Sequence, residues 1–392
     1  MNKVVVIGMA MLVLAITACG GNNPEEQKER LTQLETDSSK AYREDGDTEK
    51  ALRLARDALK LAAKMRQAGL VDEDEVAELE NKVELYTSII AAGPEEGAKL
   101  KALEAYNRSA SSKNDTAVLE GDYMVSQRKV DRSTTIAIIR GYVGSGGDIT
   151  IPSTIQNLPV REVYMNPLKN QQVTFEYEHF DPESNTMKAE SETLEANTTI
   201  TSVVIPDGVE KIGGFTGCTA LRSVTIPDSV DRIDNFAFQG CTSLSSVSIP
   251  RRVRAIPIAA FQYCTSLASV DIKHLEYGIE DSAFEDCVSL ASFPIQQGSL
   301  RSCSGIGNRA FRGCASLTSV YITRTIRWIG DLAFADCTSL ETVDIKPYKG
   351  DADDERVGRG YKDWVGYGFA NCPRLSPESR EAIRADGYED SF

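Results

Sequence analysis

The feature that most constrains the fold is a motif that recurs along the C-terminal half of the chain. A phenylalanine is followed three residues later by a cysteine seven times, and most copies are 23 residues apart. The seven pairs are Phe215/Cys218, Phe238/Cys241, Phe261/Cys264, Phe284/Cys287, Phe311/Cys314, Phe334/Cys337 and Phe369/Cys372. Repetition at this period predicts a stack of equivalent turns, because one such turn cannot enclose a core by itself.

Each turn carries further apolar residues at fixed distances from its cysteine. A leucine follows after three residues, then in most turns a valine after three more and an isoleucine after a further two. The Val-x-Ile step has the period of a β-strand, which places both apolar side chains on one face. We therefore expect a short strand and then a helical or 3₁₀ segment in each turn, with the Phe and Cys residues forming a ladder inside one shared core.

The consensus Leu-x-x-Val-x-Ile-Pro-x-x-Val-x-x-Ile-x-x-x-Ala-Phe-x-x-Cys resembles the BspA-like leucine-rich repeat of bacterial surface antigens. The resemblance begins upstream, in residues 135–160, and covers roughly residues 120–376. It implies an α/β solenoid, a leucine-rich-repeat stack of about 23-residue turns. Residues 113–165 would then form a β cap with the first half-repeat, and residues 199–376 the array. The resemblance also implies adhesion to host proteins or to other bacteria.

Several segments depart from the repeat. Residues 166–198 are a polar, acidic insertion, and residues 377–392 are interpreted as an acidic tail. The last repeat contains a charged stretch, Asp351–Arg359, which is a second candidate for ligand contact because insertions in solenoids emerge as loops. Its acidic residues lack the ordered spacing of a calcium-binding loop, so no metal site is expected there.

The N-terminus has the pattern of an exported lipoprotein. Lys3 precedes the apolar stretch Val4–Ile16, which is too short to span a bilayer, so residues 1–18 are interpreted as a signal peptide. The stretch ends in Ile16-Thr17-Ala18-Cys19, which resembles a lipobox and predicts lipid attachment at Cys19, with residues 19–24 as a tether. Diderm lipoproteins without Asp after this cysteine are typically directed to the outer membrane. The alternative is an ordinary signal peptide with a chance cysteine.

Residues 25–112 are rich in helix-forming residues and predict an all-α segment in front of the solenoid. Helix breaks are expected at Gly46-Asp47, at Gly69 and at Gly93-Pro94, and Thr48 is the expected N-cap of the second helix. The spacing of Ala41-Tyr42, Ala51 and Ala58 is similar to that of tetratricopeptide repeats. A small helical bundle or coiled spacer explains the same pattern, and both interpretations stay open.

One cysteine per turn at the same position predicts buried free thiols. Side chains of a ladder run parallel, so their Cβ atoms do not converge as a disulfide requires. Cys303, outside the ladder, is interpreted as a further core residue. Since there are no close Cys/His pairs, no zinc or other metal site is expected.

The residue between Val and Ile in each strand should point outward and contribute to one column along the sheet. The candidate ligand-binding residues in this column are Thr225, Ser248, Asp271, Tyr321 and Asp344. Tyrosine combines apolar area with a hydrogen-bonding group, so Tyr321 is the best contact candidate. The plain alternative is that these positions are simply solvated.

The net charge of −15 makes nucleic acid an unexpected partner. The sequence has no nucleophile elbow, phosphate-binding loop or paired catalytic set, which predicts a non-enzymatic protein without a cofactor. We expect a cell-envelope lipoprotein that is held by the membrane through Cys19 and binds a protein ligand, with surface adhesion as the leading hypothesis. The alternative is a periplasmic scaffold that uses the helices and the solenoid to bind envelope proteins.

Overall fold

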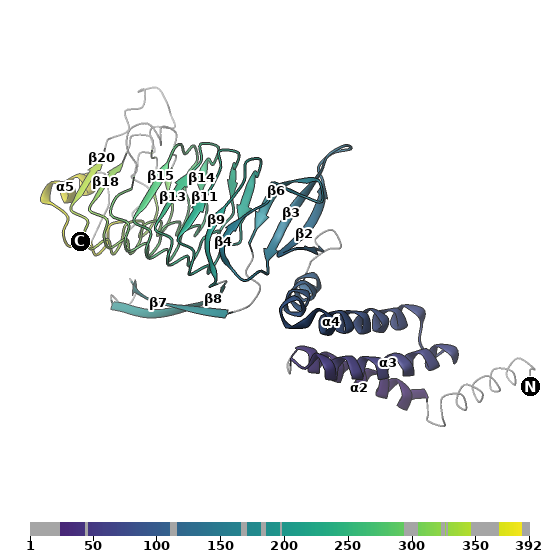
Figure 1. Cartoon of the computed structure of the whole chain (residues 1–392). Coiled ribbons are helices and arrows are strands. Elements are labelled where there is room, and N and C mark those ends of the chain that lie inside the picture. The colour runs from purple at the N-terminus through teal and green to yellow at the C-terminus, as the bar shows by residue number, and fades with distance from the viewer. Residues whose placement is uncertain are drawn as a thin grey trace, which may run out of the picture. The chain divides into compact units, whose positions relative to one another are not determined.

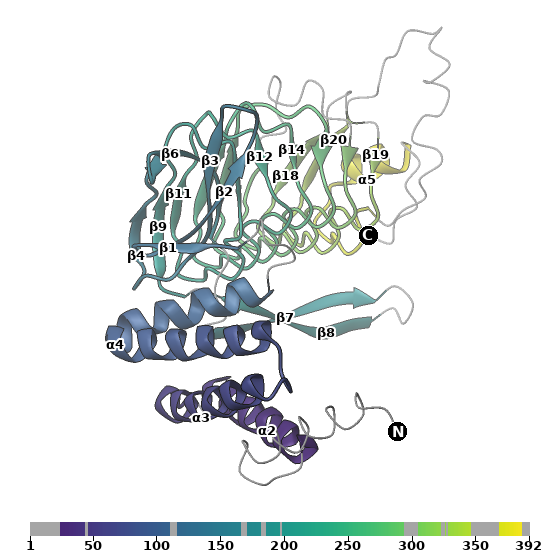
Figure 2. The ribbon, with the colours of Figure 1, turned by 90° about the vertical axis from the view of Figure 1, so that its right-hand side faces the viewer.

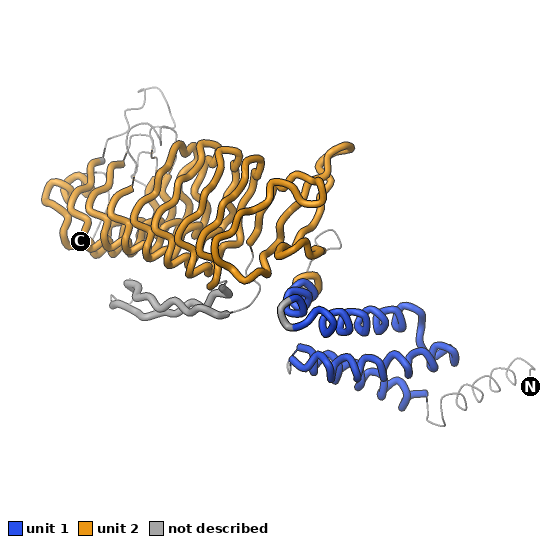
Figure 3. The backbone as a smooth tube through the Cα atoms, viewed as in Figure 1, with its two compact units in different colours: residues 1–105 blue, residues 106–392 orange. Residues whose placement is uncertain are grey.

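The computed structural model describes residues 24–43, 46–109, 116–165, 171–181, 186–196, 198–293, 305–322, 326, 328–345 and 368–385. The chain divides into two compact units, residues 1–105 and residues 106–392 (Figure 3). The first unit is helical and the second is mainly β structure. Within the described ranges, no helix has the length and apolar character needed to cross a membrane.

The helical unit contains α2 (Pro24–Arg43), α3 (Thr48–Gln67) and most of α4 (Glu73–Ser109). The expected N-cap of α3 was wrong by one residue: Asp47 caps the helix, and its carboxylate accepts a hydrogen bond from the Lys50 backbone N–H at 2.8 Å. A carboxylate at this position also interacts favourably with the positive end of the helix dipole. Gly93 has φ of +80° and breaks α4 into two helical parts, as the sequence predicted.

The helices of this unit pack through small side chains. Ala51, Ala55, Ala58 and Ala62 of α3 are fully buried. Ala58 and Ala62 pack in one cluster with Leu31 of α2. An alanine side chain occupies little space between the helices, so the two helix backbones can approach closely.

The second unit begins with an antiparallel sheet that covers the start of the solenoid. Strands β1 (Val118–Glu120), β2 (Tyr123–Lys129) and β3 (Thr135–Tyr142) are antiparallel neighbours. Strand β6 (Leu158–Tyr164) pairs parallel with β3 and antiparallel with the short β5 (Thr154–Ile155). The switch from antiparallel to parallel pairing at β6 marks the point where the chain begins to wind into turns.

The turns that follow place their strands in two sets. The strands of the first set are β4 (Gly147–Thr150), β9 (Ile200–Val204), β11 (Ser223–Thr225), β13 (Ser246–Ile249), β15 (Ser269–Ile272), β18 (Ser319–Ile322) and β20 (Thr342–Ile345). Those of the second are β10 (Lys211–Gly213), β12 (Arg232–Ile233), β14 (Ala255–Ile256), β16 (Gly278–Ile279), β17 (Gly305–Ile306) and β19 (Trp328–Ile329). All pairs formed within these two sets are parallel. The turns stack in a row (Figures 1 and 2), which confirms the predicted leucine-rich-repeat solenoid preceded by helices.

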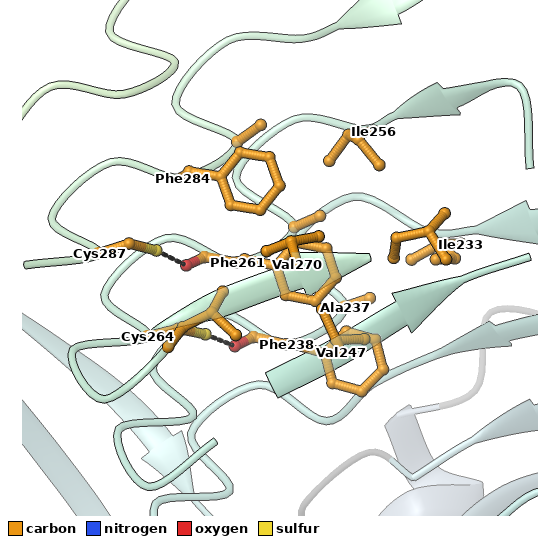
Figure 4. Packing of buried hydrophobic residues seen from close by; sticks show 14 of the residues in the cluster. Ile233, Ala237, Phe238, Val247, Ile256, Phe261, Cys264, Val270, Phe284 and Cys287 are labelled. Carbon is orange, nitrogen blue, oxygen red and sulfur yellow. Dashed lines mark hydrogen bonds between the residues drawn. The ribbon is translucent and has the colours of Figure 1, made fainter. Parts of the chain in front are cut away.

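The core of the array is a continuous stack of aromatic rings. The seven phenylalanines of the ladder are fully buried, and adjacent rings stack with centroids 4.9–5.4 Å apart and planes within 11° of parallel. Figure 4 shows Phe238, Phe261 and Phe284 in this arrangement. In the longer fifth turn, Phe293 replaces the usual valine and packs edge-on against Phe284 and Phe311.

The ladder cysteines hydrogen-bond between turns. Their thiols donate to the backbone carbonyl of the phenylalanine one turn earlier, at 3.1–3.3 Å, in six successive turns; Cys264 and Phe238 form one such pair (Figure 4). All seven ladder cysteines are free and buried. The thiols thereby satisfy carbonyl groups that would otherwise lack a partner in the core.

The chain turns sharply between each phenylalanine and its cysteine. The residue two positions after the phenylalanine has positive φ in every turn of the ladder, including Tyr263 at 59° and Asp286 at 58°. Only Gly, Asn and Asp adopt this conformation readily. Gly240, Gly313 and Asn371 at equivalent positions fit this requirement.

Two segments differ from the sequence expectation. Inside the polar insertion, β7 (Gln171–Asp181) and β8 (Thr186–Ala196) form an antiparallel hairpin. The segment interpreted as an acidic tail begins with a helix, α5 (Pro377–Ala385). Ile383 of α5 is fully buried, and the Ser379 hydroxyl accepts a hydrogen bond from the Val343 N–H of β20 at 2.9 Å. An apolar end-turn left open to water is unfavourable, so a helix that covers it is stabilising.

Cys372 lies in the last turn of the ladder. Its thiol is buried and donates to the Phe334 carbonyl at 3.1 Å, as in the other turns, but the Ala370 carbonyl of its own turn also lies within reach at 3.7 Å. Among the described residues after Cys372 there is no strand, and Leu375 leads directly into α5. The array therefore ends at Cys372, because this turn is closed by a helix and does not pair with a following turn.

Candidate binding surface

The residues predicted to contact a ligand lie along the first set of strands. Thr225, Ser248 and Asp271 are exposed, whereas Tyr321 and Asp344 are half-buried. Strand pairing aligns Ser248 with Asp271, and Tyr321 with Asp344. The structure therefore brings four of these residues together in two pairs, as a column of outward side chains requires, whereas Thr225 pairs with Val204.

This column is partly satisfied by its own hydrogen bonds. The Ser248 hydroxyl donates to the Asp271 carboxylate at 3.0 Å. In the neighbouring column on the same face, whose residues align with Ser223, the hydroxyls of Ser202 and Thr201 donate to Asp148, and these hydrogen bonds lower the pKa of the Asp148 carboxyl. Side chains bonded to one another along a ladder stabilise the stacking of the turns. They also leave fewer free donors for a ligand on this face.

A second row of polar side chains, unexpected from the sequence, runs through the interior. Gln239 donates to Gln262 at 2.7 Å, and Gln262 donates to Glu285 at 2.8 Å. Arg312 then bridges Glu285 and Asp336, with N–O distances of 3.2 and 3.4 Å, and Asn371 donates to Asp336 at 2.8 Å. We call Gln239, Gln262, Glu285, Arg312 and Asp336 the buried polar ladder; Asn371, at its end, is exposed. Each group needs its neighbour in the next turn, because burial without a partner is costly.

Asp286 lies beside the buried polar ladder, and the pKa of its carboxyl is raised. Burial and the negative charges of Glu285 and Asp336 raise the pKa of its carboxyl to about 7. Its side chain approaches Gly313 of the next turn so closely that a Cβ atom there would clash with a carboxylate oxygen. A perturbed carboxyl can indicate a functional site. Here the carboxyl abuts the packed core, and the next turn occupies the space beside it.

The second set of strands carries an open groove of about 670 Å³ on turns two to four. Exposed arginines contribute most of its charge: Arg232, Arg251, Arg252 and Arg254. The other lining residues are Asp231, Ile233, Val253, Ala255, Pro257, His274, Glu276, Tyr277 and Glu280. Sequence reasoning missed this groove, although three arginines within residues 251–254 of an acidic chain were a visible signal.

Two of these arginines already have partners. Arg252 pairs with Asp231 at 3.3 Å, and Arg254 pairs with Glu276 at 3.4 Å. Arg254 also donates a hydrogen bond to the Tyr277 hydroxyl at 3.3 Å, which holds that ring at the edge of the groove. For Arg232 and Arg251, no side-chain hydrogen bond or ion pair is formed with any residue that the structure describes.

The described part of the chain offers neither reactive ladder thiols nor a metal-binding cluster. The ladder thiols are poor nucleophiles, because burial raises the pKa of Cys241, Cys264, Cys287, Cys314 and Cys337. The described residues also contain no group of three or more His, Cys, Asp or Glu side chains placed to hold a metal ion. The predicted lipid attachment residue Cys19, the core residue Cys303 and the charged stretch Asp351–Arg359 all lie outside the described residues.

Comparison with known proteins identifies the repeats. Residues 190–303 and 299–350 match a model described as the BspA type leucine-rich-repeat region, in six copies. A solved leucine-rich-repeat protein of T. pallidum is 22% identical, with a TM-score of 0.39, over 70% of this chain and 98% of its own. A leucine-rich cell surface protein of Faecalibacterium prausnitzii is 21% identical, with a TM-score of 0.33, over 68% and 83%. A search of curated proteins found no match.

The family match agrees with the geometry of the array. The second unit is a leucine-rich-repeat solenoid, a class whose members are generally non-enzymatic binding scaffolds. Residues 190–350 match the BspA type leucine-rich-repeat region, a repeat family of the bacterial surface type. The resemblance inferred from the Phe and Cys spacing is thereby confirmed.

Proposed function

We propose that this chain is a non-enzymatic, lipid-anchored protein of the bacterial cell surface whose solenoid binds protein ligands and mediates adhesion. The observation that carries the proposal is the uninterrupted core. It holds side chains from successive turns at fixed spacing on exposed faces, and such extended surfaces bind proteins in other solenoids. The family description and the surface type of its members support the same function.

In this proposal Cys19 carries the lipid, and the helical unit spaces the array from the membrane. Several acyl chains give stable anchoring where one chain does not. Thr225, Ser248, Asp271, Tyr321 and Asp344 contribute one contact face. Their exposed or half-buried hydroxyl, carboxylate and aromatic groups suit a polar protein surface.

The location is tested by protease treatment of intact and lysed cells that express the full chain. Digestion of the solenoid on intact cells supports the proposal. Digestion only after lysis overturns surface adhesion and favours a periplasmic scaffold that binds envelope proteins. A Cys19→Ala variant should leave the membrane fraction, whereas a Cys218→Ala variant, altered in the buried ladder, should retain the anchor.

The binding face is tested separately with immobilised host matrix proteins and with neighbouring bacteria. A Thr225→Ala/Ser248→Ala/Asp271→Ala variant should bind about tenfold more weakly than the parent chain if this face makes the contact. The matched control replaces exposed residues of the cap, such as Arg132 and Ser133. Equal binding by all three proteins would show that the first set of strands is not the contact face.

A further inference from the structure

The arginine groove on turns two to four has a charge that contrasts with the rest of the chain. Four arginines line it together with three acidic residues, whereas the whole chain has a net charge of −15. Arg252 and Arg254 are engaged by Asp231 and Glu276. The groove therefore keeps a local positive charge that attracts an anion toward an otherwise repulsive surface.

The two arginines of the groove that form no ion pair within the described chain are placed for contact with a partner. Arg232 and Arg251 are exposed, and among the described residues their guanidinium groups have no partner of their own. A guanidinium group has donors in a planar fork that matches a carboxylate. Two such groups from successive turns can therefore accept two carboxylates spaced along an extended segment.

Exposed apolar side chains occur in the groove and next to one of its lining residues. Tyr277, which lines the groove, is 57% exposed, and its hydroxyl is held by Arg254. Ile258, directly after the lining residue Pro257, is 37% exposed. Phe236 is 45% exposed, and its N–H donates to the Ile258 carbonyl at 2.9 Å. Arginine and tyrosine are the residues most often responsible for affinity at protein interfaces.

We propose that this groove binds an acidic polypeptide segment of a partner protein. Carboxylates of the segment pair with Arg232 and Arg251, and its apolar side chains lie against Tyr277. The apolar neighbours favour a peptide over a sulfated glycan or a lipid headgroup, which would use only the charges. The assignment rests on the protein-binding function proposed above and adds the chemistry of the ligand and a second contact face.

The test uses the full chain and fluorescence anisotropy with a labelled synthetic peptide of glutamates with interspersed tyrosines. The parent chain should bind this peptide more tightly than an otherwise identical glutamine peptide, and added salt should weaken the binding. An Arg232→Gln/Arg251→Gln variant should bind about tenfold more weakly, as expected for the loss of two exposed charge pairs. Its melting temperature should be unchanged, because both side chains are exposed.

The matched control is Arg222→Gln/Arg309→Gln, which makes the same change in charge at exposed residues that do not line the groove. Equal losses in the two double variants, or equal binding of the glutamine peptide, would overturn the assignment. Binding of heparin oligosaccharides or of phosphatidylglycerol vesicles in place of the peptide would overturn it as well. Protease accessibility on intact cells and binding to immobilised proteins do not depend on this peptide, so the proposed function can stand if the groove assignment fails.

Discussion

Replacement of Phe238 by alanine tests how strongly the aromatic stack holds the array together. The ring is fully buried and stacks on Phe215 at 4.9 Å and on Phe261 at 5.3 Å. Phe→Ala changes in packed cores cost about 3–5 kcal/mol. Each aromatic contact adds about 0.5–1.5 kcal/mol beyond the buried area, and this ring makes two of them. The expected loss is therefore at the upper end of that range, about 4–5 kcal/mol.

The same turn supplies the matched control. Phe236 lies two residues earlier and is 45% exposed, so Phe236→Ala should change the free energy of unfolding by less than about 0.5 kcal/mol. Both variants are measured by urea unfolding. Trp328 lies in β19 of the array, and the other tryptophan, Trp364, also follows the helical unit in the sequence, so tryptophan fluorescence has no contribution from the helical unit.

The outcome distinguishes a cooperative stack from independent turns. In a solenoid, stability is a sum of turn and interface contributions, and a weakened interface can separate the array into parts. Phe238→Ala should lower the urea concentration at the midpoint of unfolding. A smaller m-value, the slope of the unfolding free energy against urea concentration, would indicate that the turns on either side unfold separately. A loss below about 2 kcal/mol, or an equal loss in Phe236→Ala, would refute the reasoning from stacking and burial.

Three further predictions concern buried polar groups. Asp286 has a pKa of about 7 in the folded chain, above its ordinary pKa of 3.8, so the contribution of this group to stability should fall as pH rises from about 4 to 7. Asp286→Asn should remove this dependence of stability on pH. It should also add about 2–4 kcal/mol to the free energy of unfolding at pH 8, measured by urea unfolding. Arg312→Met should cost about 3–5 kcal/mol in the same assay, because it leaves Glu285 and Asp336 buried without a cation, and adding Glu285→Gln should recover part of the loss. The described ladder thiols should resist alkylation in the native chain and react in denaturant, as read by mass spectrometry; rapid native labelling of Cys264 would contradict its burial.

The period of the apolar residues made the solenoid predictable. Phe, Cys, Leu, Val and Ile recur at equivalent positions, and each equivalent position faces the same core. The helix breaks at Gly69 and Gly93 were also predictable, because both glycines adopt positive φ. Both features are determined by residues close together in the sequence or at a fixed repeat, so one sequence is enough to predict them.

The repeat period alone does not predict how the solenoid ends. Cys372 has the spacing of a ladder residue from Phe369, and its burial follows from that spacing. The residues after it lack the Val-x-Ile step, so the chain enters α5 in place of a strand. A motif shared by all turns does not distinguish an interior turn of a solenoid from its terminal turn, which needs a different cover.

The buried polar ladder could not be predicted from the apolar period. Gln239, Gln262 and Glu285 each follow a core phenylalanine, and taken singly they have the composition of a surface. Their burial depends on the alignment of residues 23 positions apart, which is visible only once the turns are stacked. The arginine groove likewise combines residues of three turns.

The strand β7 and the helix α5 each have a local signal in the sequence. Val173, Phe175 and Tyr177 alternate with polar residues inside the insertion, which is typical of the strand found there. Ser376 followed by Pro377 is a helix start, and the Ser379 N–H donates to the Ser376 hydroxyl at 3.1 Å.

The hydrogen bond from each ladder thiol to the phenylalanine carbonyl of the preceding turn has an evolutionary consequence. Every interior turn presents the same acceptor to its successor and the same donor to its predecessor, so a duplicated or deleted 23-residue segment leaves the junctions chemically identical. The reach of the array can therefore lengthen or shorten in whole turns by recombination within the gene. Since the ladder thiols form no cross-links, such length variants need no new disulfide pairing to fold.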